Sequence, residues 1–293
     1  MEKLKLSRFK YKKLPKTKQS NNKSKKIIKL FYIFCLLFSF LSGFIFGTYY
    51  SNMKPKYKNR INKNLVLDIF NFQTYSQELE DFILYCIFYD IENGFYIDVG
   101  ANSPDEISVT KAFYLKGWHG INIEPLPDKY SQLMEARKRD INLNYGAGAK
   151  DESLTFYIND FGSTLEKRYS NRITNVTTIE VHPMSKICKK YCPKNEIIQF
   201  CKIDVEGGEK NVLLGYDFEN YRAKVFCIES TRPSTPIPTY DEWEYILLKN
   251  DYAFGFKYGI NRYYYDKKIE GLSERFLNLS NHIEYYKSIH KKK

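Results

Sequence analysis

The stretch FYIDVGANSP at residues 95–104 decides the fold of this chain. Its first five residues are rich in β-forming side chains, and Asp98 is the one charged residue among them. The run breaks at Gly100, and residues 107–115 then predict a helix. Because glycine has no Cβ, the backbone of such a turn can come close to a ligand. A buried strand, a glycine turn and a helix start are together typical of the ligand-binding edge of an open α/β sheet.

Similar strands and helices alternate through the rest of the chain. Further strands are predicted at residues 120–124, 141–145, 200–206 and 225–229, with a closing hairpin at 253–257 and 262–265. Residues 154–158 and 177–181 alternate apolar and polar side chains, which predicts half-exposed strands around a loop at 160–175. Helices are predicted at 65–91, in one or two pieces, and at 128–138, 209–214 and 240–249. This order predicts a doubly wound, mostly parallel sheet.

Acidic residues stand at the ends of four of these strands. They are Asp98, Glu124, the pair Asp204 and Glu206, and Glu229. The ends of parallel strands lie on one edge of a sheet, and buried carboxylates are costly there without a ligand, a metal ion or solvent. The pattern therefore predicts a binding crevice at this edge. Lys202, inside its strand, is predicted to point to the opposite face.

The basic residues are concentrated at the N-terminus. Residues 1–63 hold 17 of the 46 Lys and Arg residues and one of the 34 acids, so the remainder is mildly acidic. Such a distribution argues against a nucleic-acid partner and is typical of a polybasic membrane flank. Residues 1–29, which are rich in Lys, Ser and Asn, predict a disordered tail.

Residues 30–50, LFYIFCLLFSFLSGFIFGTYY, contain no charged side chain. A helix of this length spans about 30 Å, the thickness of the apolar core of a bilayer. A cleaved signal peptide is the rival interpretation, but its apolar core is shorter, at about 7–15 residues, and no small-residue cleavage site follows. The sequence therefore predicts a single-pass transmembrane helix in contact with membrane lipid. A linker at 51–64, a domain at 65–268 and a helical, basic tail at 269–293 are predicted to follow.

The flanking charges predict the orientation of that helix. Twelve Lys and Arg residues precede it, and five follow within residues 54–63. Since positive flanks favour the cytoplasmic side, we expect a cytoplasmic N-terminus and a C-terminal domain on the opposite side of the membrane.

The turn after residue 99 lacks the glycines that bind a pyrophosphate. Neither G-x-G-x-x-G nor G-x-x-x-x-G-K-[ST] follows the strand. Glu124 lies about twenty residues after Gly100, where an acid can accept hydrogen bonds from both ribose hydroxyls. An acid before the glycine turn favours a ligand with an ammonium group as well. S-adenosylmethionine has both groups, and its sulfonium cation suits an acidic crevice.

Five motifs in order resemble the FkbM-type methyltransferases, which use S-adenosylmethionine. They are FYIDVGAN at 95–102, GWHGINIEPLP at 117–127, DINLNYGAGAKDESLTFY at 140–157, KIDVEGGEKNVLLG at 202–215 and VFCIESTRP at 225–233. The resemblance runs from about residue 93 to 265. It implies a class I methyltransferase fold, Rossmann-like with an antiparallel last strand, and methyl transfer, commonly to a sugar or another hydroxyl.

The resemblance also implies roles for individual residues. Asp98, Gly100 and Asn102 would line the methionine end of the cofactor, and Glu124 would hold the ribose. The adenine would lie near Gly146 and Ala147. The substrate would face Asp204 and Glu206.

Transfer to a hydroxyl requires removal of its proton as the new bond forms. Asp204 or Glu206 is predicted to act as the base, or both bind a divalent cation that lowers the pKa of the hydroxyl. The sequence leaves these two alternatives open. His182 is a weaker candidate base. Cys188 and Cys192 lack the second close pair of a zinc site and are predicted to be buried thiols or a local disulfide.

The leading hypothesis is a membrane-anchored O-methyltransferase that acts on a glycan or a glycolipid-like acceptor. One alternative is a catalytically inactive relative that serves as a binding or trafficking module at the membrane. A nucleotide-sugar enzyme is a third hypothesis, and the missing pyrophosphate loop counts against it.

Overall fold

The predicted stretch lies at the centre of a seven-stranded sheet in a computed structural model, which describes residues 65–159, 162–164, 173–233 and 235–290. The strand order is β10-β11-β9-β8-β1-β2-β3. The strands are β1 Phe95–Val99, β2 His119–Ile123, β3 Ile141–Leu143, β8 Ile198–Ile203, β9 Val225–Glu229, β10 Tyr252–Tyr258 and β11 Asn261–Asp266. The five neighbouring strands β9, β8, β1, β2 and β3 are parallel to one another, and β11 is antiparallel to both of its neighbours. This mixed α/β sheet is the one that the sequence predicts.

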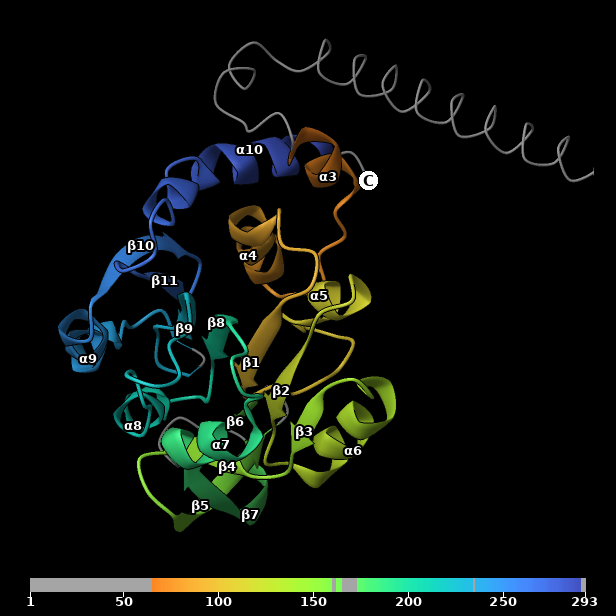
Figure 1. Ribbon diagram of the computed structural model, residues 1–293. Helices are drawn as coiled ribbons and strands as arrows, with labels where there is room; N and C mark the ends of the chain where they lie inside the picture. Colours follow the sequence, from red (N-terminus) through yellow and green to blue (C-terminus); the bar gives the residue numbers. More distant parts are fainter. Residues whose placement is uncertain (1–64, 160–161, 165–172, 234, 291–293) are drawn as a thin grey trace, which may run out of the picture. The chain divides into compact units, whose positions relative to one another are not determined.

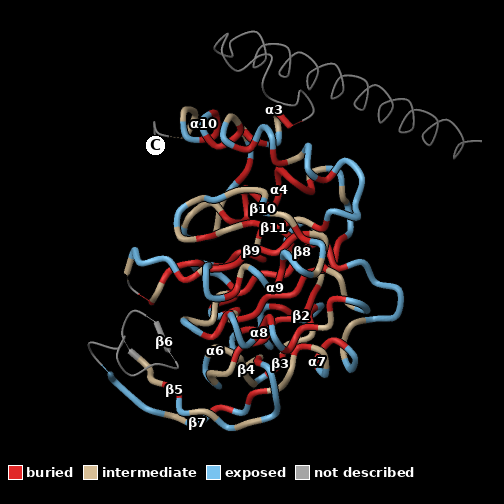
Figure 2. The backbone as a smooth tube through the Cα atoms, turned by 90° about the vertical axis from the view of Figure 1, so that its left-hand side faces the viewer, coloured by how far each residue is buried: buried red, intermediate tan, exposed pale blue. Residues whose placement is uncertain are grey.

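Helices cover both faces of this sheet (Figure 1). They are α3 Val66–Asn71, α4 Glu80–Phe88, α5 Lys111–Leu115, α6 Pro127–Ala136, α7 Met184–Tyr191, α8 Glu209–Leu214, α9 Glu244–Lys249 and α10 Leu279–His290, with 3₁₀ turns η3 Tyr240–Glu242 and η4 Ser273–Phe276. Every residue of β1, β8 and β9 is buried, as expected of strands covered on both faces (Figure 2). Helix α7 was not predicted.

Alternate residues of the central strands contact different helices. Ile97 and Ile203 pack in one apolar cluster with side chains of α7, α8 and α9. Tyr96 and Phe200 stack with ring centroids 5.7 Å apart on the other face, where Phe200 also contacts aromatic side chains of α4 and α5. The period of two along each strand therefore assigns every side chain to one of two cores.

Four shorter strands form a second sheet, in the order β4-β7-β5-β6. They are β4 Gly146–Gly148, β5 Glu152–Asn159, β6 Gly162–Thr164 and β7 Ile173–Pro183. Most of β7 is exposed, in agreement with the half-exposed strands predicted here (Figure 2). The third predicted strand ends early, at Leu143, and the glycines that were expected to close it pair with β7 instead.

The helix predicted from Ile107 begins only at Lys111. Buried Arg137 explains the difference, because its Nη2 donates to the Pro104 carbonyl and to Ser108 Oγ, the latter at 3.0 Å. These contacts fix the chain in an irregular path, and Ile107 adopts the left-handed conformation with φ 54°. A contact with a residue so distant in sequence overrides the local helical pattern.

Among the described residues after 267, those of η4 and α10 are helical, and α10 packs on α3 and α4. Among the helices of the described residues, none is long and apolar enough to cross a membrane. The predicted transmembrane segment at 30–50 lies outside the described residues, as do the tail at 1–29 and the linker at 51–64.

His282 of α10 makes the stability of this packing sensitive to acid. The ring is 4% exposed, its two nitrogens have no hydrogen-bond partner among the described residues, and burial lowers its pKa to about 4. As the pH falls from about 6.5 towards 4, the unfolded chain takes up the proton first, so stability decreases by about 3 kcal/mol in total. We expect His282→Leu to remove this decrease in urea unfolding curves measured from pH 7 to 4.5. An equal loss of stability in both proteins would contradict the assignment.

Candidate functional site

The carboxyl ends of four neighbouring parallel strands, β9, β8, β1 and β2, form one edge of the large sheet. Backbone hydrogen bonds connect the turns at this edge. The N–H groups of Gly100 and Ala101 donate to the Ile123 carbonyl at 3.0 and 3.1 Å, and Asp204 N–H donates to the Val99 carbonyl at 3.1 Å. The predicted glycine turn is therefore held against both adjacent strands.

Gly100 is the tightest point of the edge. Its φ is +80°, and a Cβ there would lie 1.9 Å from the carbonyl oxygen of Asp204. Asn102, two residues later, is also left-handed, with φ 51°. Only a residue without a side chain fits at position 100. The glycine in the sequence is therefore explained by the close packing of the β1 turn against the end of β8.

The position of Lys202 contradicts the prediction that its side chain points to the face opposite the site. It pairs with Asp98 in the strand register and lies on the same face of the sheet. Its Nζ is 3.3 Å from Asp98 Oδ1 and 3.6 Å from Asp204 Oδ2, and it donates to the Gly100 carbonyl at 2.6 Å. Burial lowers the pKa of Lys202, but the two carboxylates raise it by more, so the lysine is a fixed cation at the edge.

Removing that cation leaves Asp98 buried without its counter-ion. The Asp98 side chain is 2% exposed and that of Lys202 is 10% exposed. We expect Lys202→Met to destabilise the protein by about 3 kcal/mol, because an uncompensated buried charge is costly. The double variant Asp98→Asn/Lys202→Met should regain more than half of that loss in urea unfolding experiments followed by tryptophan fluorescence. The pairing would be contradicted if the loss of stability in the double variant equalled the sum of the losses in Asp98→Asn and Lys202→Met.

Glu124 follows the end of β2 and is 5% exposed. Its Oε2 accepts from Asn102 N–H at 2.8 Å and its Oε1 from Leu126 N–H at 2.9 Å. Burial raises the pKa of Glu124, and these two N–H groups offset part of the increase. Each oxygen keeps a second lone pair for a hydroxyl donor. The carboxylate thus connects the β1 turn to the β2 turn and still has accepting capacity.

The predicted adenine-side residues lie in the second sheet. Gly146 and Ala147 belong to β4, opposite Val181 and His182 of β7. Asn144, two residues before β4, donates to the Glu124 carbonyl at 3.1 Å. The chain therefore passes directly from contact with Glu124 into β4.

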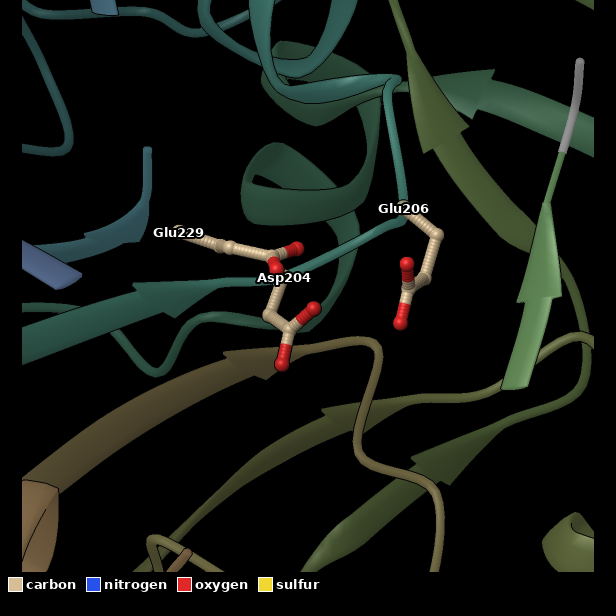
Figure 3. Close-up of side chains that lie close together, drawn as sticks. All are labelled: Asp204, Glu206 and Glu229. Carbon is tan, nitrogen blue, oxygen red and sulfur yellow. The ribbon is translucent and has the colours of Figure 1, made fainter. Parts of the chain in front are cut away.

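Asp204, Glu206 and Glu229 meet at the other end of the edge (Figure 3). One carboxylate oxygen of each lies within 4.8 Å of the others, and among the described residues they are the only such group of His, Cys, Asp or Glu. Burial is the main cause that raises the pKa of Glu206 to about 8 and that of Glu229 to about 12, and the neighbouring carboxylates add to both shifts. The cluster therefore favours a bound proton or a cation.

A fourth acid, Glu209, holds the loop that carries this cluster. It is 2% exposed, and its Oε1 accepts from the N–H groups of Val205 and Gly207, both at 3.1 Å. Burial raises its pKa to about 7, against the effect of these hydrogen bonds. Glu206 lies in this loop and has a left-handed backbone conformation, with φ 55°. Sequence reasoning missed Glu209, although its place three residues after Glu206 at a helix start was a usable signal.

The weaker candidates lie elsewhere. His182 Nδ1 is 2.5 Å from Asp151 Oδ1, and that pair is partly exposed on the second sheet. Cys188 and Cys192 are free thiols one turn apart at the end of α7. Neither thiol belongs to a metal-binding group among the described residues.

A comparison with protein families agrees with this geometry. Residues 98–254 match the model described as Methyltransferase FkbM domain. The match covers more than half of the chain, begins at Asp98 and ends within β10, so it includes all the strand-end acids named above. No curated protein matches the chain in a sequence search.

Proposed function

The chain belongs to the FkbM methyltransferase family, and on that premise we propose that it O-methylates a sugar or a glycan-like hydroxyl from a membrane surface. S-adenosylmethionine is the cofactor that this family suggests. When bound, it supplies an electrophilic methyl group on a sulfonium cation. The observation that carries the proposal is the convergence of Asp98, Glu124 and the three-acid cluster on one edge beside Gly100.

The residues at the edge fit that cofactor by their chemistry. Lys202 supplies one positive charge against the two carboxylates of Asp98 and Asp204, so the edge keeps a net negative charge that suits a sulfonium and an ammonium group. Asp98, Gly100 and Asn102 would hold the methionine end, and Glu124 has the accepting capacity for ribose hydroxyls. Gly146 and Ala147, just beyond Asn144, would border the adenine.

The chain's own part in the reaction is positioning and proton removal. In-line methyl transfer gains most of its acceleration from the orientation of the two reactants, which the rigid strand ends provide. The acceptor hydroxyl must also lose its proton as its oxygen attacks. Asp204 and Glu206 are the carboxylates at the cluster best exposed to receive it, since Glu229 is buried.

Transfer of a labelled methyl group tests this function. The full-length chain in mild detergent, incubated with methyl-labelled S-adenosylmethionine and a membrane glycan extract, should label carbohydrate in a base-stable form. Methyl ethers of hydroxyls resist base, whereas methyl esters of carboxylates hydrolyse. Asp204→Asn should abolish the labelling. Cofactor binding without any transfer would instead favour a non-catalytic binding module.

The membrane anchor at residues 30–50 is a separate element of the proposal. Its support is the uncharged segment itself and the basic residues on both sides of it. Protease added to sealed vesicles whose cytoplasmic face points outward should leave the C-terminal domain intact if that domain lies across the membrane from the cytoplasm. Digestion of the domain in the same vesicles would place it on the cytoplasmic side.

A further inference from the structure

The three-acid cluster lies where two neighbouring parallel strands end. Glu229 is the last residue of β9, and Asp204 and Glu206 follow directly after β8. Figure 3 shows Asp204 and Glu229 side by side, while Glu206 points its carboxylate towards the same space from the loop. The cluster is therefore built from two rigid elements and one short turn held by Glu209.

The spacing of the three carboxylates fits the coordination shell of one hard cation. The oxygens lie within 4.8 Å of one another. Two oxygens on opposite sides of Mg²⁺ lie about 4.2 Å apart and those on opposite sides of Ca²⁺ about 4.8 Å, with smaller separations for adjacent ligands. Small side-chain rotations would therefore bring all three oxygens onto a single ion.

Glu229 supplies a second, independent observation. The residue is 5% exposed, and its Oε2 is fully buried with no hydrogen-bond partner among the described residues. No described Lys, Arg or His forms a salt bridge with it, and the carboxylates that Lys202 contacts are those of Asp98 and Asp204. A buried carboxylate oxygen normally has a partner, so this one indicates a ligand that enters the cluster.

We propose that Asp204, Glu206 and Glu229 bind one divalent cation of the Mg²⁺ type at the edge of the sheet. Carboxylate oxygens are the ligands that hard cations prefer, and Mg²⁺ commonly keeps several positions for water or substrate. Three protein ligands leave such positions open. In the proposed methyltransferase an acceptor hydroxyl would occupy one of them, and the ion would lower the pKa of that hydroxyl. Asp204 and Glu206 would then act as ligands of the ion in place of a direct proton acceptor. This effect on the hydroxyl rests on the proposed function, whereas cation binding does not.

Binding of Mn²⁺ to the metal-stripped, full-length chain tests the site, because paramagnetic Mn²⁺ is an observable substitute for Mg²⁺. Electron paramagnetic resonance of free Mn²⁺ should show one bound ion per chain with a dissociation constant below about 1 mM, and excess Mg²⁺ should displace it. Glu229→Gln and Asp204→Asn should each weaken binding at least about tenfold, the equivalent of 1.4 kcal/mol. Glu219→Gln, which removes an exposed acid elsewhere, should leave binding unchanged.

Three results would overturn the site: no bound Mn²⁺, equal binding by both cluster variants and the wild type, or an equal loss in Glu219→Gln. Absence of binding would mean that protons rather than a cation neutralise the cluster, and the other two results would mean that the bound Mn²⁺ lies elsewhere on the chain. Asp204 is partly exposed, so we expect Asp204→Asn to fold and to test the site even if Glu229→Gln does not fold. A parallel titration with S-adenosylmethionine separates the two proposals. Cofactor binding without Mn²⁺ binding overturns only the cation site, and Mn²⁺ binding without cofactor binding overturns only the function.

Discussion

Gly100→Ala is expected to destabilise this protein by about 4 kcal/mol or more, a large part of the stability of an ordinary domain. The new Cβ would lie 1.9 Å from the Asp204 carbonyl oxygen, and the residue would keep a φ of +80°. The two nearest atoms, the carbonyl oxygen and carbon of Asp204, belong to the backbone, so no side-chain rotation can relieve the clash. The turn has to separate from β8, which breaks the Asp204-to-Val99 hydrogen bond and displaces the cluster.

Gly271→Ala is the matched control for this experiment. Gly271 has a similar φ of +74°, but no heavy atom lies within 4 Å of the position its Cβ would take. We expect it to cost about 1–2 kcal/mol, the strain of the left-handed backbone alone. Trp118 and Trp243 are both buried and report unfolding in urea. Equal losses in the two variants would contradict the close approach of the β1 turn to β8.

Glu124→Ala is expected to weaken the binding of S-adenosylmethionine about a hundredfold. Hydrogen bonds to a charged group are each worth about 1.5–3 kcal/mol, and the ribose would lose them together with the ordered Asn102 turn. Glu124→Gln keeps the shape and one accepting oxygen, so its loss should be intermediate. Equilibrium dialysis with labelled cofactor measures both.

Asp128→Ala is the control, because it removes an exposed acid four residues further along the same turn and helix. It should bind the cofactor as the wild type does. Tryptophan fluorescence on each variant confirms that it is folded before binding is compared. Unchanged affinity in a folded Glu124→Ala protein would remove Glu124 from the binding site.

The large sheet was predictable because its central strands are buried on both faces. Such strands are short apolar runs, and in β1, β8 and β9 each run closes on or next to an acid or a glycine turn. That pattern can be recognised in the local sequence, without knowing which strands are neighbours in the sheet. It placed Asp98, Glu124, Asp204 and Glu229 on one edge, where the described residues have them.

The features that were missed depend on contacts between distant residues. The face of Lys202 follows from its register with Asp98, 104 residues earlier in the chain, which no local period reveals. Three small residues at 146–148 form a strand only because β7 pairs with them. The delayed start of α5 depends on Arg137 in the same way. Local pattern therefore predicted which residues reach the edge, but not how they are fixed there.

Calorimetric titration of the full-length chain with S-adenosylmethionine decides whether this strand-end edge binds the cofactor. We predict saturable heat at one molecule per chain, and loss of that heat in the folded Glu124→Ala variant. Absence of heat and of any thermal stabilisation in a wild-type chain whose two tryptophans report a folded core would contradict it.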